Sequence, residues 1–205
     1  MTDEYIISHG AGLNICFLGP DGVGKGTVIS ILIRRHNAQY FHLKPRKKRG
    51  PTTENHHTAP HSLPQYSRLK TLVKLIYLFL EYQVFWYINC IMLRDKERFC
   101  IFDRYIDDIL VDPKRFRLKG NTLIRKIVVK YLPKPDIYFI LNASAQEIYR
   151  RKHELNLKEI ERQIKEYNLM IDGRRYIKIN AERPVEEIIE EVYKYINKFN
   201  RENKL

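Results

Sequence analysis

The chain has 205 residues, of which 44% are hydrophobic, so it is long enough to form one domain with a sizeable core. Its 37 lysines and arginines exceed its 24 aspartates and glutamates, which gives a formal net charge of +13. This charge favours anionic ligands, but the basic residues are spread along the chain, so it does not predict specific nucleic-acid binding.

Cysteine usage and the N-terminal sequence both favour a cytoplasmic protein. Cys16, Cys90 and Cys100 show no metal-binding or CxxC spacing, and two of them lie in strand-like runs. Buried thiols in a reducing compartment fit this pattern. Residues 1–12 lack the basic-then-apolar order of a secretory signal.

The first predicted strand, Leu13–Leu18, leads into the glycine-rich stretch GPDGVGKGT and then into a helix that runs to about His36. Such a loop between a buried strand and a helix N-terminus directs backbone N–H groups and the helix dipole at one point, which suits a phosphate. In this spacing the lysine can reach the β- and γ-phosphates of ATP, and the threonine hydroxyl can bind Mg²⁺. An ordinary strand–turn–helix corner is the alternative. The predicted nucleotide-binding residues are Gly19, Asp21, Gly22, Val23, Gly24, Lys25, Gly26, Thr27 and Val28.

Residues 38–43 predict a short second strand, which a basic and then histidine-rich segment follows. Prolines at positions 45, 51, 60 and 64 argue against any regular element over about residues 44–64, so a long loop is expected there. Its basic run could clamp a phosphate, with Arg46 as a candidate acceptor-binding residue, or it could be a solvated charge run. His56, His57 and His61 lack a convincing set of partners for zinc.

Residues 65–96 predict a long helix whose section 72–93 is apolar enough to raise the question of a membrane span. Lys74, Glu81, Gln83 and Asn89 interrupt this section, so a helix packed on a sheet is favoured and no transmembrane segment is expected. A carboxylate in such apolar surroundings needs a partner or a ligand. Glu81 is therefore a candidate acceptor-binding residue.

A further apolar strand, residues 99–102, ends at Asp103 and Arg104. An acidic residue at the end of a second apolar strand is where a P-loop enzyme holds Mg²⁺, directly or through water. The neighbouring guanidinium can contact phosphate oxygens in bidentate fashion. A strand-end ion pair is the alternative. In the loop that follows, Asp107, Asp108 or Asp112 could bind an acceptor hydroxyl or act as a base, or they could be surface turn residues.

Helices and strands alternate over the rest of the chain. The predicted elements are a helix at 122–132, a strand at 136–141, a helix from about Ala145, a charged helix at 157–170, a strand at 176–180 and a helix at 184–199. This order predicts a parallel sheet covered by helices on both faces, with ligands at the C-terminal ends of the strands. The cations at 150–152 fit a short lid over phosphates, or favourable charges near a helix C-terminus.

From about Leu13 to Phe199 the chain resembles the thymidylate kinase family of P-loop nucleoside monophosphate kinases. The similarity rests on GPDGVGKGT, with Gly26 where many members have serine, and on FDRY, ILNASAQEIYRRK and INAERPVEEI. It implies a single three-layer α/β P-loop NTPase domain over residues 1–205, with a five-stranded parallel sheet and a lid at about 150–158. The family roles it implies are Lys25, Asp103, Arg104 and Arg150 as catalytic residues, Thr27 and Asp103 at the metal, and Ala181 against adenine.

The acceptor half departs from the family pattern. HLKPRKKRG replaces an Arg-Glu-Pro-Gly-Gly-like stretch, Glu81-Tyr82 replaces an Asp-Arg pair, and IDDILVDPKRFR replaces a segment with Ser and then Tyr-Gln. Tyrosine cannot supply the forked donors of a guanidinium. By position, Tyr82, Tyr105 and Asp108 join Arg46 and Glu81 as candidate acceptor-binding residues. With its DDLLVDP-like string the chain also looks similar to thymidylate-kinase-like proteins of surface-polysaccharide clusters, which would suit a sugar or other small acceptor.

The residues and the resemblance together predict a kinase that moves the γ-phosphoryl group of Mg-ATP to a small acceptor. The family favours dTMP and nucleotide biosynthesis, and a sugar or sugar phosphate is the alternative. An ATP-binding regulatory or scaffold protein without transfer is a third hypothesis, based on the missing acceptor motif. The resemblance also implies a homodimer through the long apolar helix.

Overall fold

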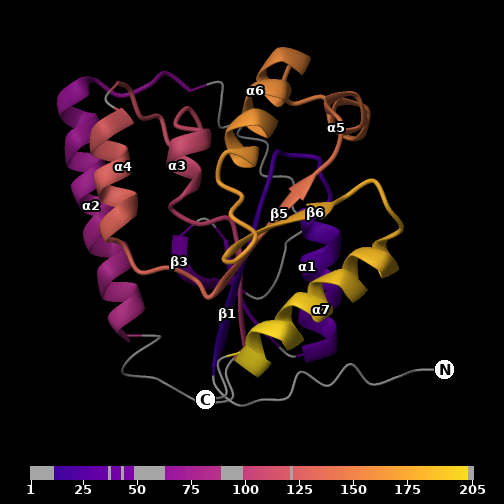
Figure 1. Ribbon diagram of the computed structural model, residues 1–205. Coiled ribbons are helices and arrows are strands. Elements are labelled where there is room, and N and C mark those ends of the chain that lie inside the picture. Colours follow the sequence, from indigo (N-terminus) through magenta and orange to yellow (C-terminus); the bar gives the residue numbers. More distant parts are fainter. Residues whose placement is uncertain are drawn as a thin grey trace.

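A computed structural model describes residues 12–36, 38–42, 44–48, 63–88, 99–120 and 122–202, with side chains left out at 44–48. Over these residues a six-stranded sheet has the strand order β3-β2-β4-β1-β5-β6 (Figure 1). The strands are β1 (Leu13–Leu18), β2 (Gln39–His42), β3 (Lys44–Lys48), β4 (Phe99–Asp103), β5 (Ile137–Asn142) and β6 (Tyr176–Asn180). The pairs β2–β4, β4–β1, β1–β5 and β5–β6 are all parallel, as predicted.

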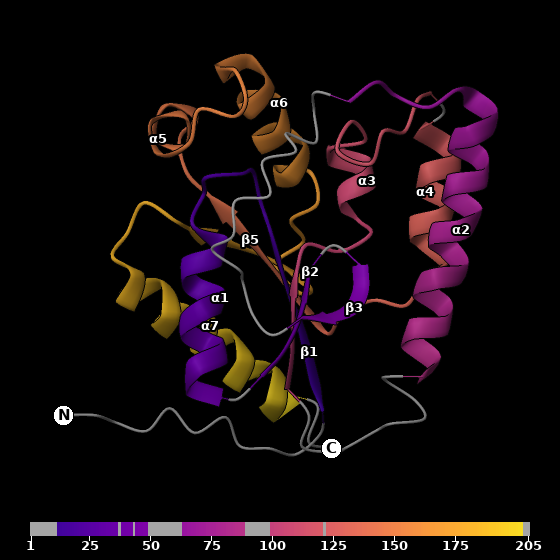
Figure 2. The same ribbon diagram turned by 180° about the vertical axis from the view of Figure 1, so that it is seen from behind.

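The sixth strand, β3, corrects the prediction of an unbroken loop over residues 44–64. It pairs antiparallel with β2 at the edge of the sheet, on the side of α2 (Figure 2). Pro45 is tolerated there because an edge strand has one side on which no ladder hydrogen bond is required. Residues 49–62, which include the three histidines of this segment, lie outside the described residues.

The helices are α1 (Lys25–His36), α2 (Arg68–Trp86), α3 (Asp108–Val111), α4 (Thr122–Tyr131), α5 (Ala145–Arg151), α6 (Leu157–Asn168) and α7 (Val185–Glu202). All except α3 were predicted, because the spacing of apolar residues that indicates a helix lies within each segment itself. α2 begins after Ser67, whose hydroxyl caps the helix by accepting a hydrogen bond from the Lys70 N–H at 3.4 Å. The one-turn helix α3 lies where a loop was expected, and the predicted continuation of α2 over 89–96 lies outside the description.

Each face of the sheet carries its own hydrophobic core, which makes the three-layer fold that the sequence predicts. Alternate residues of β1 face opposite sides, so Ile15 and Phe17 pack toward α1 and α7 while Leu18 packs toward α2, α3 and α4. Figures 1 and 2 show these two helix layers on either side of the strands. Burial of each such side chain contributes roughly 1.5–3 kcal/mol.

Two expectations drawn from composition can be compared with the fold. Cys16 and Cys100 are buried in β1 and β4 and form no disulfide, as predicted, while Cys90 lies outside the described residues. Within the described ranges, no helix combines the length and apolar character needed to cross a membrane.

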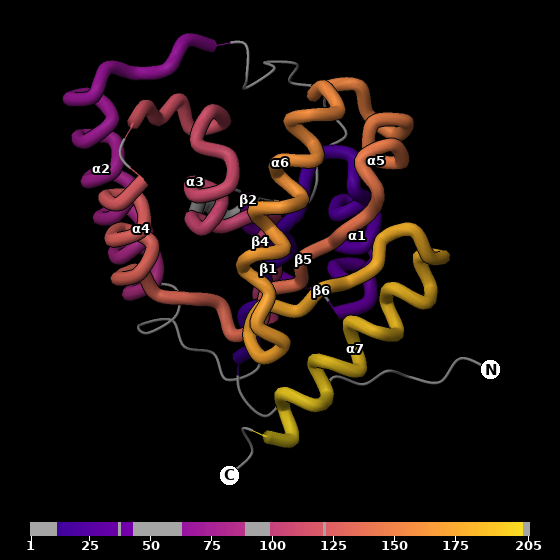
Figure 3. The backbone as a smooth tube through the Cα atoms, turned by 45° about the horizontal axis from the view of Figure 1, so that its top comes forward, coloured from indigo at the N-terminus to yellow at the C-terminus, as the bar shows by residue number. Residues whose placement is uncertain are grey.

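The C-terminal ends of the parallel strands meet at one edge of the sheet. The register pairs Phe17 of β1 with Asp103 of β4, and the backbone N–H of Arg104 donates to the Phe17 carbonyl at 3.0 Å. Figure 3 shows α3 and α6 next to this edge. The fold thus brings the glycine-rich loop and the Asp103-Arg104 pair side by side.

Candidate functional site

The backbone of the glycine-rich loop has a positive φ at three glycines, and at two of them a Cβ would also collide with a neighbour. Gly19 has φ +140°, and a Cβ there would lie 2.6 Å from the Leu141 carbonyl oxygen. Gly22 has φ +86°, and a Cβ there would lie 2.8 Å from the Cβ of Lys152. At Gly26, by contrast, a Cβ would meet open space, so the serine of many family members would fit there too. The loop is therefore packed tightly against the segment after α5.

Lys25 lies in the first turn of α1 and is buried. Its ammonium donates hydrogen bonds of 2.8 Å to the carbonyls of Gly19 and Pro20. Burial, and then the nearby Arg104 guanidinium, lower the pKa of Lys25 to about 7, although Asp21 opposes the shift. A desolvated ammonium held by neutral carbonyls is a site for an anion.

Asp103 ends β4 with one carboxylate oxygen occupied and one free. Its Oδ2 accepts hydrogen bonds from the Tyr40 hydroxyl and lies 3.1 Å from the His42 Nδ1, while the buried Oδ1 has no hydrogen-bond partner. Burial alone would raise the pKa of Asp103, but the His42 hydrogen bond and Lys25 hold it at about 2. A buried charged oxygen without a partner is costly unless a ligand completes it.

Arg104 stands at φ 70°, an uncommon backbone conformation for a residue with a side chain, and its side chain is only 2% exposed. Its Nη1 donates to Asp108 Oδ2 at 2.5 Å and to the Tyr167 hydroxyl at 3.0 Å, and its Nη2 donates to Asp21 Oδ1 at 2.7 Å. The Tyr167 hydroxyl donates in turn to Asp108 Oδ1 at 2.8 Å. The strand end, the phosphate loop, α3 and α6 are thus joined through one guanidinium.

A second guanidinium, that of Arg115, contacts the same loop. It donates to Asp21 Oδ2 through Nη2 and to Asp112 Oδ2 through Nε at 3.2 Å. Burial would raise the pKa of Asp21, but Arg104 and then Arg115 hold it well below its usual value. Asp21 is therefore an anion that bridges two arginines.

The cations after β5 separate into an outer and an inner group. Arg150 pairs with Glu147 and its side chain is 75% exposed. Arg151 turns inward: its guanidinium donates to the Val23 carbonyl at 3.3 Å and to the Ala181 carbonyl at 3.2 Å. The inner arginine joins the phosphate loop to the turn before α7, where the resemblance implies adenine.

The candidate acceptor residues lie in different environments. Tyr82 of α2 and Tyr105 are buried and pack edge to face at 4.9 Å, and the Tyr105 hydroxyl donates to the Pro133 carbonyl. Glu81 accepts a hydrogen bond from Tyr77, one turn earlier on α2. Asp108 is in the Arg104 network, and the side chain of Arg46 lies outside the description.

Sequence reasoning missed His42, Tyr40 and Tyr167 as site residues and did not separate Arg115 from its basic neighbours. None of them belongs to a motif, since each reaches the site by long-range packing. Position in the chain was a signal that could have identified His42. It ends the strand next to β4, and the C-terminal ends of parallel strands lie at the same edge of the sheet.

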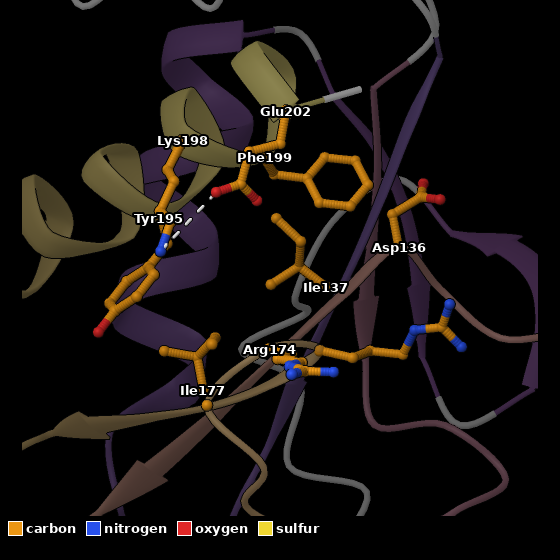
Figure 4. Close-up of a pocket in the computed structure, with 10 residues that line it drawn as sticks. Asp136, Ile137, Arg174, Ile177, Tyr195, Lys198, Phe199 and Glu202 are labelled. Atoms are coloured by element: carbon orange, nitrogen blue, oxygen red, sulfur yellow. Dashed lines mark ion pairs between the residues drawn. The ribbon is translucent and has the colours of Figure 1, made fainter. Parts of the chain in front are cut away.

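A cavity of about 470 Å³ lies apart from this site, at the opposite ends of β5 and β6. Figure 4 shows Asp136 and Ile137 on one side of it and Tyr195, Lys198 and Glu202 of α7 on the other. Lys198 pairs with Glu202 at 3.8 Å. The cavity shares no lining residue with the phosphate loop, so it is not part of the candidate site.

Comparison with known proteins identifies the fold. No protein-family model matches the sequence, and no curated protein matches it. A thymidylate kinase structure from Candida albicans is similar with a TM-score of 0.60 and 16% identity, covering 92% of each chain. One from Ehrlichia chaffeensis has a TM-score of 0.57 and 18% identity, covering 91% of this chain and 99% of that one. Deoxyadenosine kinase from M. mycoides with bound dATP has a TM-score of 0.55 and 18% identity, covering 90% and 99%. At such low identities the likeness shows a shared fold alone.

Proposed function

We propose that this protein is a P-loop kinase that transfers the γ-phosphoryl group of ATP to a small acceptor. The observation that carries the proposal is Lys25, a buried ammonium with a pKa of about 7 that donates to loop carbonyls at the N-terminus of α1. An ATP phosphate would replace these weak partners with a full negative charge, and the helix N-terminus adds to the attraction.

The residues present fit a magnesium ion with the nucleotide. Asp103 offers a buried oxygen without a partner, and Thr27 lies in the first turn of α1 with its side chain exposed. Asp103 and Thr27 would hold the ion, whose chemistry is to neutralise charge on the transferring phosphates. Carboxylate and hydroxyl oxygens are ligands that Mg²⁺ prefers.

Catalysis by this chain would consist mainly of positioning and charge stabilisation. Lys25 would bind the phosphates of ATP, and Arg104 would hold the phosphate loop in place through its bond to Asp21. Arg151 would fix the nucleotide end of the loop through Val23 and Ala181. Arg150, as the predicted start of a lid, would have to leave Glu147 to reach a phosphate.

Two classes of acceptor are consistent with this site. The thymidylate kinase resemblance favours dTMP, whose phosphate would need an arginine that is not already bonded to a carboxylate. A compound that offers a hydroxyl, such as a sugar or nucleoside, is the second candidate. The hydrogen bonds that already occupy Arg104 favour the second class.

A homodimer would cover the outer face of α2, which remains a prediction from the resemblance. This face is apolar and exposed over the length of the helix, at Leu69, Leu72, Val73, Ile76, Leu80 and Val84. Sedimentation of the purified protein measures the oligomeric state.

The proposal is tested by measuring ADP release from Mg-ATP with a panel of nucleoside monophosphates, nucleosides and sugars. Wild type should release ADP with at least one acceptor, and Lys25→Ala should abolish that release together with ATP binding. If Lys25→Ala abolishes ATP binding while the cellular function survives, the protein is not a kinase. If ATP binds but no acceptor supports release, the regulatory hypothesis is favoured.

A further inference from the structure

We infer that the acceptor offers an uncharged hydroxyl group to the ATP γ-phosphate and carries no phosphate of its own at the reacting end. This inference rests on the proposed kinase function and narrows its substrate class. It rests on the carboxylates that bind the arginines beside the phosphate loop, and on the buried Asp103 oxygen that has no hydrogen-bond partner.

Three of the five N–H groups of the Arg104 guanidinium already donate to protein oxygens. Nη1 is used by Asp108 and Tyr167, and Nη2 by Asp21, so both terminal nitrogens donate to protein oxygens. The side chains of Arg104 and Asp108 are 2% and 0% exposed, which makes this pair a fixed part of the interior. A phosphate that needed the fork in bidentate fashion would have to displace a buried carboxylate.

Arg115 is held by carboxylates through two of its three guanidinium nitrogens. Its Nη2 donates to Asp21 and its Nε to Asp112, while its backbone N–H also donates to Asp112 Oδ1 at 3.2 Å. The side chain is 10% exposed and that of Asp112 1% exposed. The edge of the guanidinium formed by Nε and Nη2 is therefore taken by carboxylates.

Carboxylates outnumber the two paired guanidiniums beside the phosphate loop. Among the described side chains in this cluster, Asp21, Asp103, Asp108 and Asp112 are four anions against two guanidiniums. Lys25 is a further cation at the loop, and the ATP phosphates would engage it. A monophosphate acceptor would add its own negative charge beside that of ATP, whereas a hydroxyl compound adds none.

The free oxygen of Asp103 would face the magnesium ion or one of its waters. Oδ1 is buried and has no partner, while Oδ2 is held by Tyr40 and faces His42. An acceptor hydroxyl or a metal-bound water brings a donor proton, and a phosphate dianion does not. Ionised carboxylates only accept hydrogen bonds, so this cluster suits a hydroxyl group better than a second phosphate.

The first test compares matched pairs that differ only in the phosphate: thymidine with dTMP, and glucose with glucose 6-phosphate. Binding to full-length wild type is measured by calorimetry with Mg²⁺ and a non-hydrolysable ATP analogue, and ADP release is measured with ATP. The inference expects the phosphorylated member of each pair to bind no more tightly than its hydroxyl partner. The two pairs distinguish a nucleoside from a sugar. Tighter binding or faster turnover of dTMP than of thymidine would overturn the inference.

The second test removes the charge that holds the Arg104 guanidinium, with the substitution Asp108→Asn. It decides the case in which neither member of a pair binds to wild type. The affinity for dTMP should rise about tenfold, because one charge-assisted bond to Arg104 is released for the phosphate. Glu190→Gln, which removes an equal charge from an exposed position on α7, should leave it unchanged. No gain in a folded Asp108→Asn protein would refute the role of the carboxylates. Should that variant not fold, Asp21→Asn, at a side chain 16% exposed, frees the same arginines.

Failure of the inference can be told apart from failure of the kinase proposal. If the protein is not a kinase, wild type will fail to bind the Mg²⁺–ATP analogue or will release no ADP with any acceptor. If only the inference is wrong, ADP release will be robust and dTMP will be the better acceptor.

Discussion

Replacing Lys25 with methionine should stabilise the protein in the absence of nucleotide. The wild-type ammonium is buried, and its pKa falls from 10.5 to about 7. A shift of that size corresponds to a cost of at most ~5 kcal/mol at neutral pH. The two carbonyl hydrogen bonds of Lys25 offset about half of it, at ~1–1.5 kcal/mol each. The net gain for methionine is roughly 2 kcal/mol, which raises the melting temperature by about 4–8 °C.

The stability difference between wild type and Lys25→Met should depend on pH in a characteristic direction. Between pH 7 and 10.5 the unfolded lysine is protonated and the folded one is not, so wild-type stability rises with pH in this window. The advantage of methionine should therefore be greatest below pH 7 and should shrink as the pH rises toward 10.5.

Thermal unfolding by circular dichroism, repeated at several pH values without nucleotide, measures both effects. Lys198→Met is the matched control, since that side chain is 66% exposed and its loss should change little. An Mg²⁺–ATP analogue should stabilise wild type and leave Lys25→Met unchanged. A variant no more stable than wild type at neutral pH, or an advantage independent of pH, would refute the reasoning.

Three further substitutions test the packing around the site. Gly22→Ala forces a Cβ against Lys152 at φ +86°, so ATP binding should be lost and stability reduced by ~1–3 kcal/mol, as calorimetry and thermal melting would show. Asp107→Ala removes a buried carboxylate that accepts three side-chain hydrogen bonds, so urea unfolding should report a loss of about 3–5 kcal/mol. Arg151→Ala should weaken ATP binding about tenfold through the loss of its carbonyl contacts, whereas the exposed Arg150→Ala should leave ATP affinity unchanged. Equal effects of the two arginine changes would contradict the inward position of Arg151.

The regular elements could be predicted from the sequence because their signals are local. The strand 13–18 matches β1 residue for residue, and the predicted helix 122–132 differs from α4 by one residue. β3 was missed because its prolines and lysines disfavour a strand when read alone. It pairs with β2 at the sheet edge, where the cost of Pro45 is small.

The partners of the site residues could not be predicted, because they come from distant parts of the chain. Tyr167 on α6 meets Arg104 across 63 positions, and Arg115 meets Asp21 across 94. No periodicity or motif in the sequence indicates which residues so far apart in the chain will be in contact. Likewise, the choice between Arg150 and Arg151 depends on how α5 is rotated against the phosphate loop.

The sequence by itself determined the alternating α/β order, the glycine-rich loop and the acidic–basic pair at the end of β4, since spacing and residue type suffice for each. Only the tertiary structure decided which oxygen of Asp103 is left without a partner and which carboxylates hold Arg104. The physical reason is that the hydrogen bonds and the pKa of a charged group in the interior depend on the groups packed around it. Those neighbours are brought together by the packing of β1, β4, α3 and α6, which are separate in the chain.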